Sequence, residues 1–340
     1  MDVIATIWKK PYYTDRNQRM IDAGVDFFRI KCSHVGTDEI ANVLAEARKQ
    51  VDSSMRKVGL LVDLPEAKIR LGEFPQEGAI PVAAGTSFHF RLGESSPGPE
   101  DFIPVRFAEL AKYITVGDEF YCGDGILLFR VTEIIDSNHF IAVAQNNSRL
   151  LHRSSLMFPK LADTLDHITP VLSEIIKILP DSRPEMVAFS FVKSQAMLEQ
   201  LCRLLEPVLT DDWHPRIISK IETAEGVRNI DEILASCDGI MIARGDLGIN
   251  IPFTELGVVQ KRLVKKARDQ KKYVIVATQM LQSLLDNYIP MRSDILDVTN
   301  ACLDGASAVM LCAETAHSEF PERAVSIAKR IIDVCIAEAE

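Results

Sequence analysis

The chain has 340 residues, of which 47% are hydrophobic and 25% are charged, and its formal net charge is −10. This net charge argues against nucleic-acid binding, because affinity for a phosphodiester backbone depends largely on dense Lys and Arg. No apolar run approaches the roughly 20 residues that span a bilayer, so we expect no membrane contact. A chain of this length can bury a sizeable core in one large or two moderate domains.

Neither the N-terminus nor the cysteines indicate secretion. The chain begins as a strand, without the basic flank and small-residue cleavage site of a secretory signal, and we expect a cytoplasmic protein. An odd number of cysteines without a close pair predicts neither a disulfide framework nor a zinc site, and we interpret them as reduced, mostly buried thiols. They are Cys32, Cys122, Cys202, Cys237, Cys302, Cys312 and Cys335.

Strands and helices alternate through the first 63 residues. Thr37 offers an N-cap for the second helix, and Gly24 is a natural C-terminal cap for the first. This alternation predicts a parallel sheet with right-handed crossovers. The predicted strands are 3–8, 26–31 and 58–63, and the predicted helices are 16–23 and 37–49.

From about Gly72 the alternation stops. Gly and Pro punctuate short alternating runs, and Gly123, Asp124 and Gly125 predict a hairpin turn. We therefore expect a separate small β-rich domain at residues 73–160, inserted into a main domain made of residues 1–72 and 161–340.

The alternation then resumes to the end of the chain. Eight strands, each followed by a helix, predict an α/β fold, a (β/α)8 TIM barrel with a small β-barrel lid inserted after the third strand. The remaining predicted strands are 186–190, 216–222, 239–243, 273–277 and 306–312. The remaining predicted helices are 165–179, 194–205, 227–235, 256–267, 279–285, 293–303 and 323–339.

Polar residues follow most of these strands. Catalytic groups of such barrels stand at the C-terminal ends of the strands, so these side chains would share one mouth. They are Ser33, Asp63, Ser190, Lys220, Glu222, Asp246, Thr278 and Glu314.

Lys220 and Glu222 lie two residues apart, so they share one face of their strand. The strand at 239–243 runs directly into Arg-Gly-Asp-Leu-Gly, which adds the carboxylate of Asp246 and a permissive turn. An isolated Lys-x-Glu is usually a solvated ion pair. Polar ends on neighbouring strands favour instead metal-assisted chemistry on an anion.

Six collinear stretches resemble the pyruvate kinase family, and they cover the barrel and the inserted domain. The chain is thereby identified as a member of that family, which implies phosphoryl transfer from phosphoenolpyruvate to a nucleoside diphosphate such as ADP, giving pyruvate and ATP. The stretches are RIKCSH at 29–34, KIRLG at 68–72, IISKIE at 217–222, DGIMIARGDLG at 238–248, ATQML at 277–281 and DGASAVMLCAETA at 304–316.

The resemblance implies a role for each matching residue. Lys220 matches the lysine that stabilises charge near the transferred phosphoryl group and the enolate of pyruvate. Glu222 and Asp246 match the two carboxylates that hold a divalent ion, Mg²⁺ or Mn²⁺. Arg29 and Arg70 match arginines that face the phosphoryl groups.

Two further positions match contacts of the substrate. The amides of Gly245 and Asp246 match those that receive its carboxylate. Thr278 matches the threonine that also touches this carboxylate and helps to deliver the proton to carbon. We expect His34 and Glu314 to support the site rather than to react.

The monovalent cation site of the family is altered in this chain. Ser33 and Asp63 remain, but Lys31 replaces an asparagine and Leu64 replaces a threonine. Lys68 stands where potassium-dependent members carry glutamate, which resembles the potassium-independent branch, where a lysine ammonium takes the place of the cation. We expect activity without added potassium, although Lys31 places a second ammonium near the same site.

The nucleotide side also departs from the family. Trp8-Lys9-Lys10 replaces a glycine-proline pair, residues 64–67 replace a glycine-rich segment, and Arg153-Ser154 replaces a lysine pair. These changes leave two alternatives open. One is metal-dependent lyase or decarboxylase chemistry on the same enolpyruvate site. The other is a catalytically silent paralogue.

The C-terminal end of the chain also differs from the family. The chain stops at Glu340, whereas typical members continue into a domain with an allosteric sugar-phosphate site, so we expect no regulation by that route. A homo-oligomer formed through barrel helices is compatible with the sequence.

Overall fold

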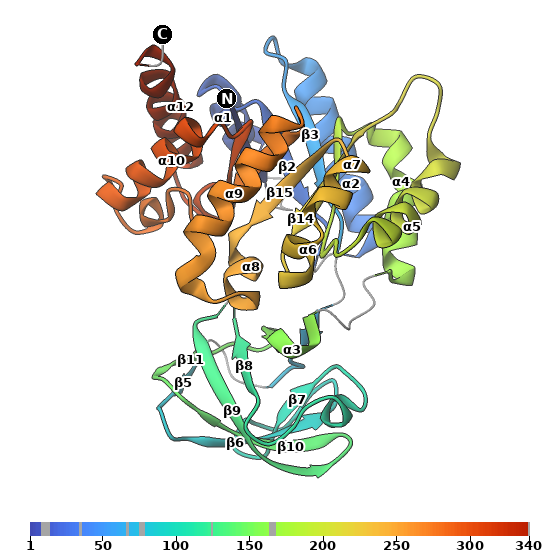
Figure 1. Ribbon diagram of the computed structural model, residues 1–340, viewed down its shortest axis with the longest axis vertical. Coiled ribbons are helices and arrows are strands. Elements are labelled where there is room, and N and C mark those ends of the chain that lie inside the picture. Colours follow the sequence, from blue (N-terminus) through green and yellow to red (C-terminus); the bar gives the residue numbers. More distant parts are fainter. Residues whose placement is uncertain are drawn as a thin grey trace. The chain divides into compact units, whose positions relative to one another are not determined.

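The computed structural model describes residues 1–7, 14–33, 36–65, 68–74, 79–123, 125–162 and 168–338 (Figure 1). The chain forms two compact units. The first contains Met1–Glu66, His167–Gly248 and Phe253–Glu340, and the second contains Ala67–Asp166 and Ile249–Pro252.

Eight parallel strands of the first unit form a closed barrel in the order β1-β17-β16-β15-β14-β13-β3-β2. The first and last strands close it, with Val3 beside Val309. The predicted (β/α)8 fold is therefore confirmed. The strands are β1 (Asp2–Ile7), β2 (Phe27–Lys31), β3 (Gly59–Asp63), β13 (Met186–Phe189), β14 (Arg216–Ile221), β15 (Gly239–Ala243), β16 (Tyr273–Ala277) and β17 (Ala308–Leu311).

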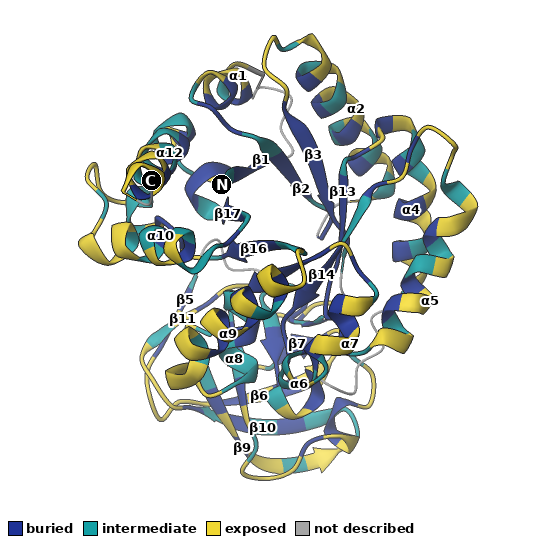
Figure 2. Cartoon of the chain, turned by 45° about the horizontal axis from the view of Figure 1, so that its top comes forward, coloured by how far each residue is buried: buried dark blue, intermediate teal, exposed yellow. Residues whose placement is uncertain are grey.

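These strands are nearly continuous apolar runs because both of their faces are covered. Every residue of β3, β13, β15 and β17 is buried, and Figure 2 shows buried strands ringed by helices whose outer faces are exposed. One apolar cluster joins strands all round the barrel. Its buried members are Ile4, Leu61, Met186, Ala188, Ile218, Met241, Ile275, Ala277, Ala308 and Met310.

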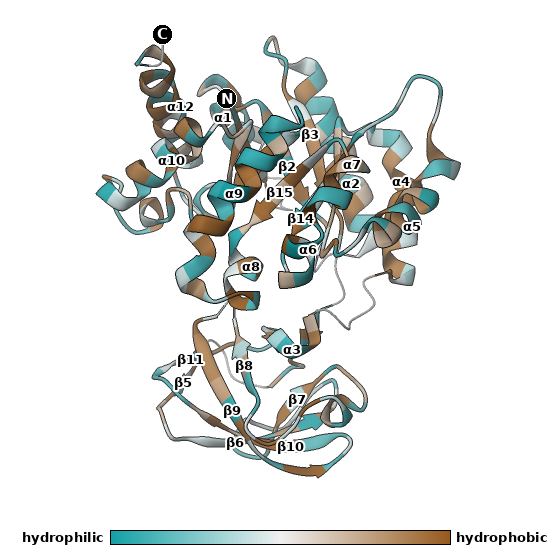
Figure 3. Cartoon of the chain, in the orientation of Figure 1, coloured by the Kyte–Doolittle hydropathy of each residue, from teal (hydrophilic) through white to brown (hydrophobic). Residues whose placement is uncertain are grey.

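The longer helices of the first unit bury an apolar stripe. In α9 the stripe contains Val259, Leu263 and Ala267 at helical spacing, and Figure 3 shows the same alternation of hydrophobic and hydrophilic faces. The helices are α1 (Thr14–Asp22), α2 (Thr37–Ser53), α4 (Pro170–Ser182), α5 (Gln195–Leu205), α6 (Ala224–Arg228), α7 (Ile230–Ala235), α8 (Arg244–Asn250), α9 (Leu256–Asp269), α10 (Arg292–Asp304), α11 (Ala313–Ala316) and α12 (Pro321–Ala337).

The second unit is a nearly closed barrel-like sheet of seven strands in the order β4-β12-β8-β9-β10-β6-β7. Its edge strands meet: Leu71 bridges Val105, and the Gly72 amide donates to the Pro104 carbonyl at 2.8 Å. The seven strands are β4 (Ile69–Arg70), β6 (Ser87–Leu92), β7 (Ile103–Val105), β8 (Glu119–Cys122), β9 (Leu127–Asp136), β10 (His139–Ala144) and β12 (Ser155–Met157). A separate pair consists of β5 (Ile80–Val82) and β11 (Ser148–Leu150), and α3 (Pro159–Ala162) follows β12.

Aromatic side chains fill the middle of this sheet. Phe90 is fully buried and stacks on Phe140 with ring centroids 5.1 Å apart, while Phe120 and Phe129 meet it edge-on. Such contacts add to the free energy gained from burial alone, so this unit has an apolar core of its own.

Some element predictions need correction. The helix predicted at 279–285 is only a short 3₁₀ turn, η5 (Gln282–Leu285), and Thr278 and Gln279 before it have positive φ. The helix predicted at 165–179 is α4, which begins at Pro170 because Thr169 caps it by accepting from the Leu172 amide at 3.2 Å. Strands β8 and β9 do pair antiparallel, but Asp124 in their predicted turn lies outside the described residues.

All seven cysteines lie in the described part of the chain and are free thiols, four of them buried. Within the same part of the chain, no helix combines the length and the apolar character needed to cross a membrane.

Candidate active site

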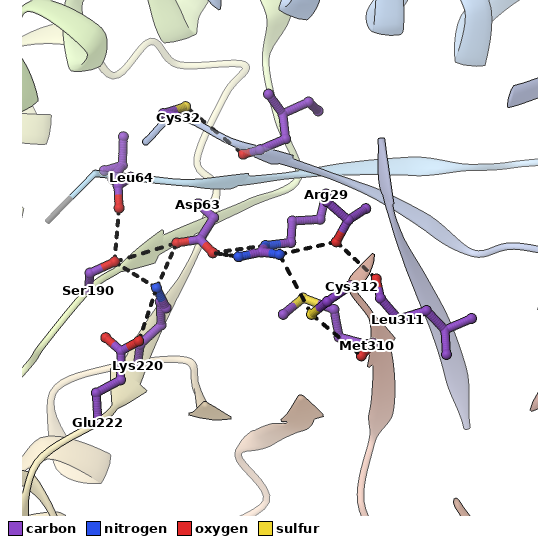
Figure 4. Close-up of polar contacts among 12 residues, drawn as sticks. Arg29, Cys32, Asp63, Leu64, Ser190, Lys220, Glu222, Met310, Leu311 and Cys312 are labelled. Carbon is purple, nitrogen blue, oxygen red and sulfur yellow. Dashed lines mark hydrogen bonds and ion pairs between the residues drawn. The ribbon is translucent and has the colours of Figure 1, made fainter. Parts of the chain in front are cut away.

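The carboxylate of Asp63, at the end of β3, binds two buried cations, one from the neighbouring strand β2 and one from β14, two strands away (Figure 4). On one side Lys220 Nζ of β14 lies 3.0 Å from Asp63 Oδ1. On the other side Arg29 of β2 donates from Nε and Nη2 to Oδ2 at 2.8 and 2.5 Å. Asp63 therefore fixes both cations at the C-terminal ends of the barrel strands.

This cluster is almost completely removed from water. The exposed fraction is 1% for Asp63, 4% for Lys220 and 7% for Arg29. Burial by itself would raise the pKa of Asp63, but the opposing effects of Lys220, Arg29 and Lys31 outweigh it and hold this pKa below its usual value. The carboxylate is thus ionised at neutral pH, as a partner of buried cations must be.

Lys220 has two further acceptors. Its Nζ lies 3.2 Å from Glu222 Oε1 and donates to the Ser190 hydroxyl at 2.7 Å. The other oxygen of Glu222 accepts from the Phe191 amide at 2.7 Å. Three acceptors match the three protons of an ammonium group, so the position of Lys220 is set before any substrate arrives.

On the side away from Asp63, Arg29 is held by β1 and by the residue that follows β17. Its Nη1 donates to Thr6 Oγ1 of β1 at 3.1 Å and contacts Cys312 Sγ, next to β17, at 3.7 Å. Thr6 in turn donates to the Leu311 carbonyl at 2.9 Å. Burial raises the pKa of the Cys312 thiol although Arg29 opposes this, so Arg29 faces a neutral thiol there and its charge is balanced at Asp63.

Three residues of the predicted monovalent cation site lie on β2 or directly after β2 or β3. Lys31 is paired with Asp63 in the ladder between β2 and β3 and contributes to the lowered pKa of Asp63. Ser33 is buried and follows β2. Leu64 is buried, and its carbonyl accepts from the Ser190 hydroxyl at 2.9 Å. An ammonium group thus lies on the strand next to the carboxylate.

The next two strand ends carry the other candidates. Gly245 and Asp246 lie in the first turn of α8, directly after β15. Thr278 follows β16, the neighbour of β15, with Ala243 beside Ala277 in the ladder. A Cβ placed on Gly245 would lie 3.2 Å from Thr278 Cγ2, so the structure brings these two segments into contact.

The carboxylates of Glu222 and Asp246 follow β14 and β15, which are neighbours in the barrel. Mg²⁺ prefers hard oxygen ligands and often binds through one or two carboxylates, completing its shell with water and substrate. This donor set fits such an ion or Mn²⁺. Within the described ranges, no group of three or more His, Cys, Asp or Glu side chains is placed to hold a metal.

The other sequence candidates lie in the second unit or outside the described residues. Lys68 and Arg70 belong to the second unit. Arg153, also in that unit, forms an ion pair with Glu73. Trp8 and His34 lie outside the described residues, as do Lys9, Lys10, Glu66 and Ala67.

Several contacts of the site had no sequence signal, even where one partner was a sequence candidate. Thr6 and Cys312 contact Arg29, although they lie about 300 residues apart in the chain. The Glu314 carboxylate accepts from the Cys312 amide at 2.6 Å, and burial raises its pKa. Arg244 belongs to the segment 238–248 that was identified from the sequence. Its partner Asp297 lies 53 residues away on α10, and no sequence pattern indicated that it contributes to the site.

Comparisons with known proteins point to one family. The sequence model of the family described as "Pyruvate kinase, barrel domain" matches residues 1–325. A pyruvate kinase of Thermococcus litoralis is 36% identical over 336 residues, which cover 97% of this chain and 68% of the relative. One from Thermotoga maritima is 31% identical over 97% of this chain and 69% of the relative. For one from Geobacillus stearothermophilus the values are 33%, 97% and 56%.

Proposed function

Because the chain belongs to the pyruvate kinase family, we propose that it transfers the phosphoryl group of phosphoenolpyruvate to ADP and yields pyruvate and ATP. It is a phosphotransferase of the pyruvate kinase type. The observation that supports this reaction most strongly is the pair of buried cations. The single carboxylate of Asp63 holds both Arg29 and Lys220 at the strand ends.

The two cations suit a phosphoryl group in transfer. Charge in such a transition state is spread over phosphoryl oxygens, and catalysis comes mainly from positioning and electrostatic stabilisation. The guanidinium of Arg29 and the ammonium of Lys220 are already desolvated and fixed, so little reorganisation accompanies the reaction. Lys220 would also stabilise the enolate of pyruvate.

Binding of substrate would rearrange one contact of Lys220. Its contact with Glu222, at 3.2 Å, is the longest of the three described above. We expect a phosphoryl oxygen to replace Glu222 there, while Asp63 and Ser190 keep the ammonium in place. Glu222 and Asp246 then hold the divalent ion.

A bound Mg²⁺ or Mn²⁺ would polarise the carbonyl oxygen of pyruvate and neutralise charge on the phosphoryl group. The Gly245 and Asp246 amides are in the first turn of α8, where backbone N–H groups lack intrahelical acceptors, and would receive the substrate carboxylate. Thr278, in contact with Gly245, would help to deliver the proton to carbon.

We also propose that this enzyme needs no potassium. The support is Lys68, which matches the lysine of the potassium-independent branch, together with a second ammonium, that of Lys31. Lys31 lies on the strand beside Asp63 and helps to lower the pKa of Asp63. A tethered ammonium can supply the positive charge of a bound monovalent ion. Turnover in a sodium-free tetramethylammonium buffer should equal turnover in potassium, and a large stimulation by potassium would contradict the proposal.

The reaction is tested with phosphoenolpyruvate, ADP and Mg²⁺ in an assay coupled to lactate dehydrogenase. Formation of pyruvate is the expected result, and its absence would reject phosphoryl transfer to ADP. In that case, deuterium exchange into the methyl group of pyruvate without nucleotide would indicate lyase or decarboxylase chemistry on an enolate. Lack of exchange would indicate a silent paralogue.

Lys220→Met tests the assignment of the central cation. Loss of this preorganised charge should lower kcat by about 10²-fold or more. Lys261→Met is the matched control, because Lys261 is 54% exposed and pairs with Asp304 on the surface. Near-normal turnover of a folded Lys220→Met variant would contradict the assignment.

A further inference from the structure

The segment after β16 has a strained backbone. Thr278 has a φ of 77° and Gln279 has a φ of 56°. A positive φ is uncommon for a residue with a side chain and is an outlier for a β-branched one. Such conformations persist where the surrounding structure enforces them, and they gather at functional sites.

The side chain of Arg244 binds the backbone of this segment. Its Nε donates to the carbonyls of Ala277 at 3.2 Å and Thr278 at 3.1 Å. Its Nη2 donates to the carbonyls of Thr278 and Gln279, the latter at 3.2 Å. One guanidinium therefore binds three successive carbonyls, which turns them all toward Arg244.

The guanidinium is itself held from the other side. Arg244 Nη1 and Nη2 donate to the two oxygens of Asp297 at 2.7 and 2.6 Å, and Nη1 also donates to Gln260 Oε1 at 3.2 Å. A bidentate ion pair of this kind fixes the orientation of the guanidinium as well as its distance from the carboxylate. The Arg244 side chain is only 12% exposed, so water competes little for these contacts.

The consequence is the direction in which Thr278 faces. Its carbonyl binds Arg244, while its methyl and hydroxyl groups lie 3.2 and 3.7 Å from the point where a Cβ of Gly245 would stand. Gly245 and Asp246 directly follow Arg244 in the chain. The same residue thus connects the segment of Asp246 to the segment of Thr278.

We propose that Arg244, oriented by Asp297, is a positioning residue that holds Thr278 in its strained conformation, so that the hydroxyl faces the substrate. The role of Thr278 in delivering a proton to carbon rests on the proposed function. Arg244 itself touches no reacting atom in this scheme and acts through Thr278.

Arg244→Lys tests the proposal, because lysine keeps the charge but lacks the planar fork that binds three carbonyls and a carboxylate together. Proton delivery is measured as deuterium exchange into the methyl group of pyruvate. We expect this rate to fall by about 10²-fold, the effect of a reacting group displaced by about 1 Å. Arg262→Lys, which changes an exposed arginine of α9, is the matched control.

A purely structural role predicts different results. It would lower exchange only in proportion to the folded fraction, which circular dichroism measures, and that result would overturn the proposal. Asp297→Asn should lower exchange in the same way, and the double variant should be no worse than Arg244→Lys alone, because both changes release the same guanidinium. Additive losses would contradict a single positioning unit.

A second measurement does not depend on the reaction. In a crystal structure of Arg244→Lys, Thr278 should leave its φ of 77°, and an unchanged φ would overturn the proposal. If the unaltered enzyme neither made ATP nor exchanged deuterium, the proposed function would fail, yet the conformation of Thr278 would still decide whether Arg244 holds it.

Discussion

Asp63→Asn removes the negative charge that two buried cations share. At 3.0 Å from Lys220 Nζ, the attraction is roughly 5.5 kcal/mol at an effective dielectric constant of about 20. The cost of desolvation offsets part of such attractions. Breaking a buried pair by removing one partner nevertheless costs about 3–5 kcal/mol, because the remaining charge is left uncompensated. We therefore expect the free energy of unfolding to fall by about that amount at pH 7.

The dependence on pH follows from the lowered pKa of Asp63. A carboxyl group with a lower pKa in the folded than in the unfolded state stabilises the protein above its unfolded pKa of about 3.9. This contribution is lost as the pH falls through the folded pKa. The difference between the unaltered protein and Asp63→Asn should therefore be constant near neutral pH and shrink below about pH 4.

Urea unfolding followed by tryptophan fluorescence measures this in the barrel alone. The chain has two tryptophans, Trp8 and Trp213, and both belong to the first unit. Trp213 is buried, and its indole donates to the Pro184 carbonyl at 2.9 Å. The fluorescence of Trp213 therefore reports on unfolding of the first unit.

Asp231→Asn is the matched control, because it removes an exposed carboxylate paired with Lys266. Exposed pairs contribute little, so the midpoint of unfolding should hardly move. Equal midpoints for Asp63→Asn and the unaltered protein at pH 7 would refute the reasoning, as would a difference that did not shrink at all below about pH 4.

Three further predictions concern the cation sites and the second unit. Lys31→Asn combined with Lys68→Glu removes both candidate ammonium groups, so turnover should become dependent on potassium, and a rate that stays independent of potassium would show that neither lysine replaces the ion. Removal of divalent ions with EDTA should abolish turnover and addition of Mg²⁺ should restore it, whereas activity that survives chelation would contradict the roles of Glu222 and Asp246. Phe90→Ala empties the middle of the aromatic core and should destabilise the second unit by about 3–5 kcal/mol. Limited proteolysis should then cut residues 67–166 faster while the tryptophan transition stays in place, and unchanged proteolysis would count against an independent core.

The barrel could be predicted because its strands are continuous apolar runs, and polar residues follow most of them. The same regularity placed Lys220 and Glu222 on one strand face, and both lie at the end of β14 as expected. The pairing of Arg29 with Asp63 could not be predicted in detail, since it depends on the register of β2 against β3.

The segment after β16 shows where sequence reasoning fails. Residues 279–285 have a helical pattern, yet Thr278 and Gln279 adopt positive φ because Arg244 binds their carbonyls. This arrangement depends on Asp297, a residue of another helix. The helix propensity of residues 279–285 contains no information about a contact with a distant residue. The contact with Arg244 overrides this propensity.

Closure of the barrel between β1 and β17 determines when the site forms during synthesis. Thr6 binds Leu311, 305 residues further along the chain, and Arg29 needs both Thr6 and Cys312 beside it. At a synthesis rate of about 5–20 residues per second, roughly 15–60 s separate these partners on the ribosome. Thr6 and Asp63 are therefore made early, but Arg29 lacks its contact with Cys312 until β17 has emerged, and the barrel that holds the two cations cannot close before then.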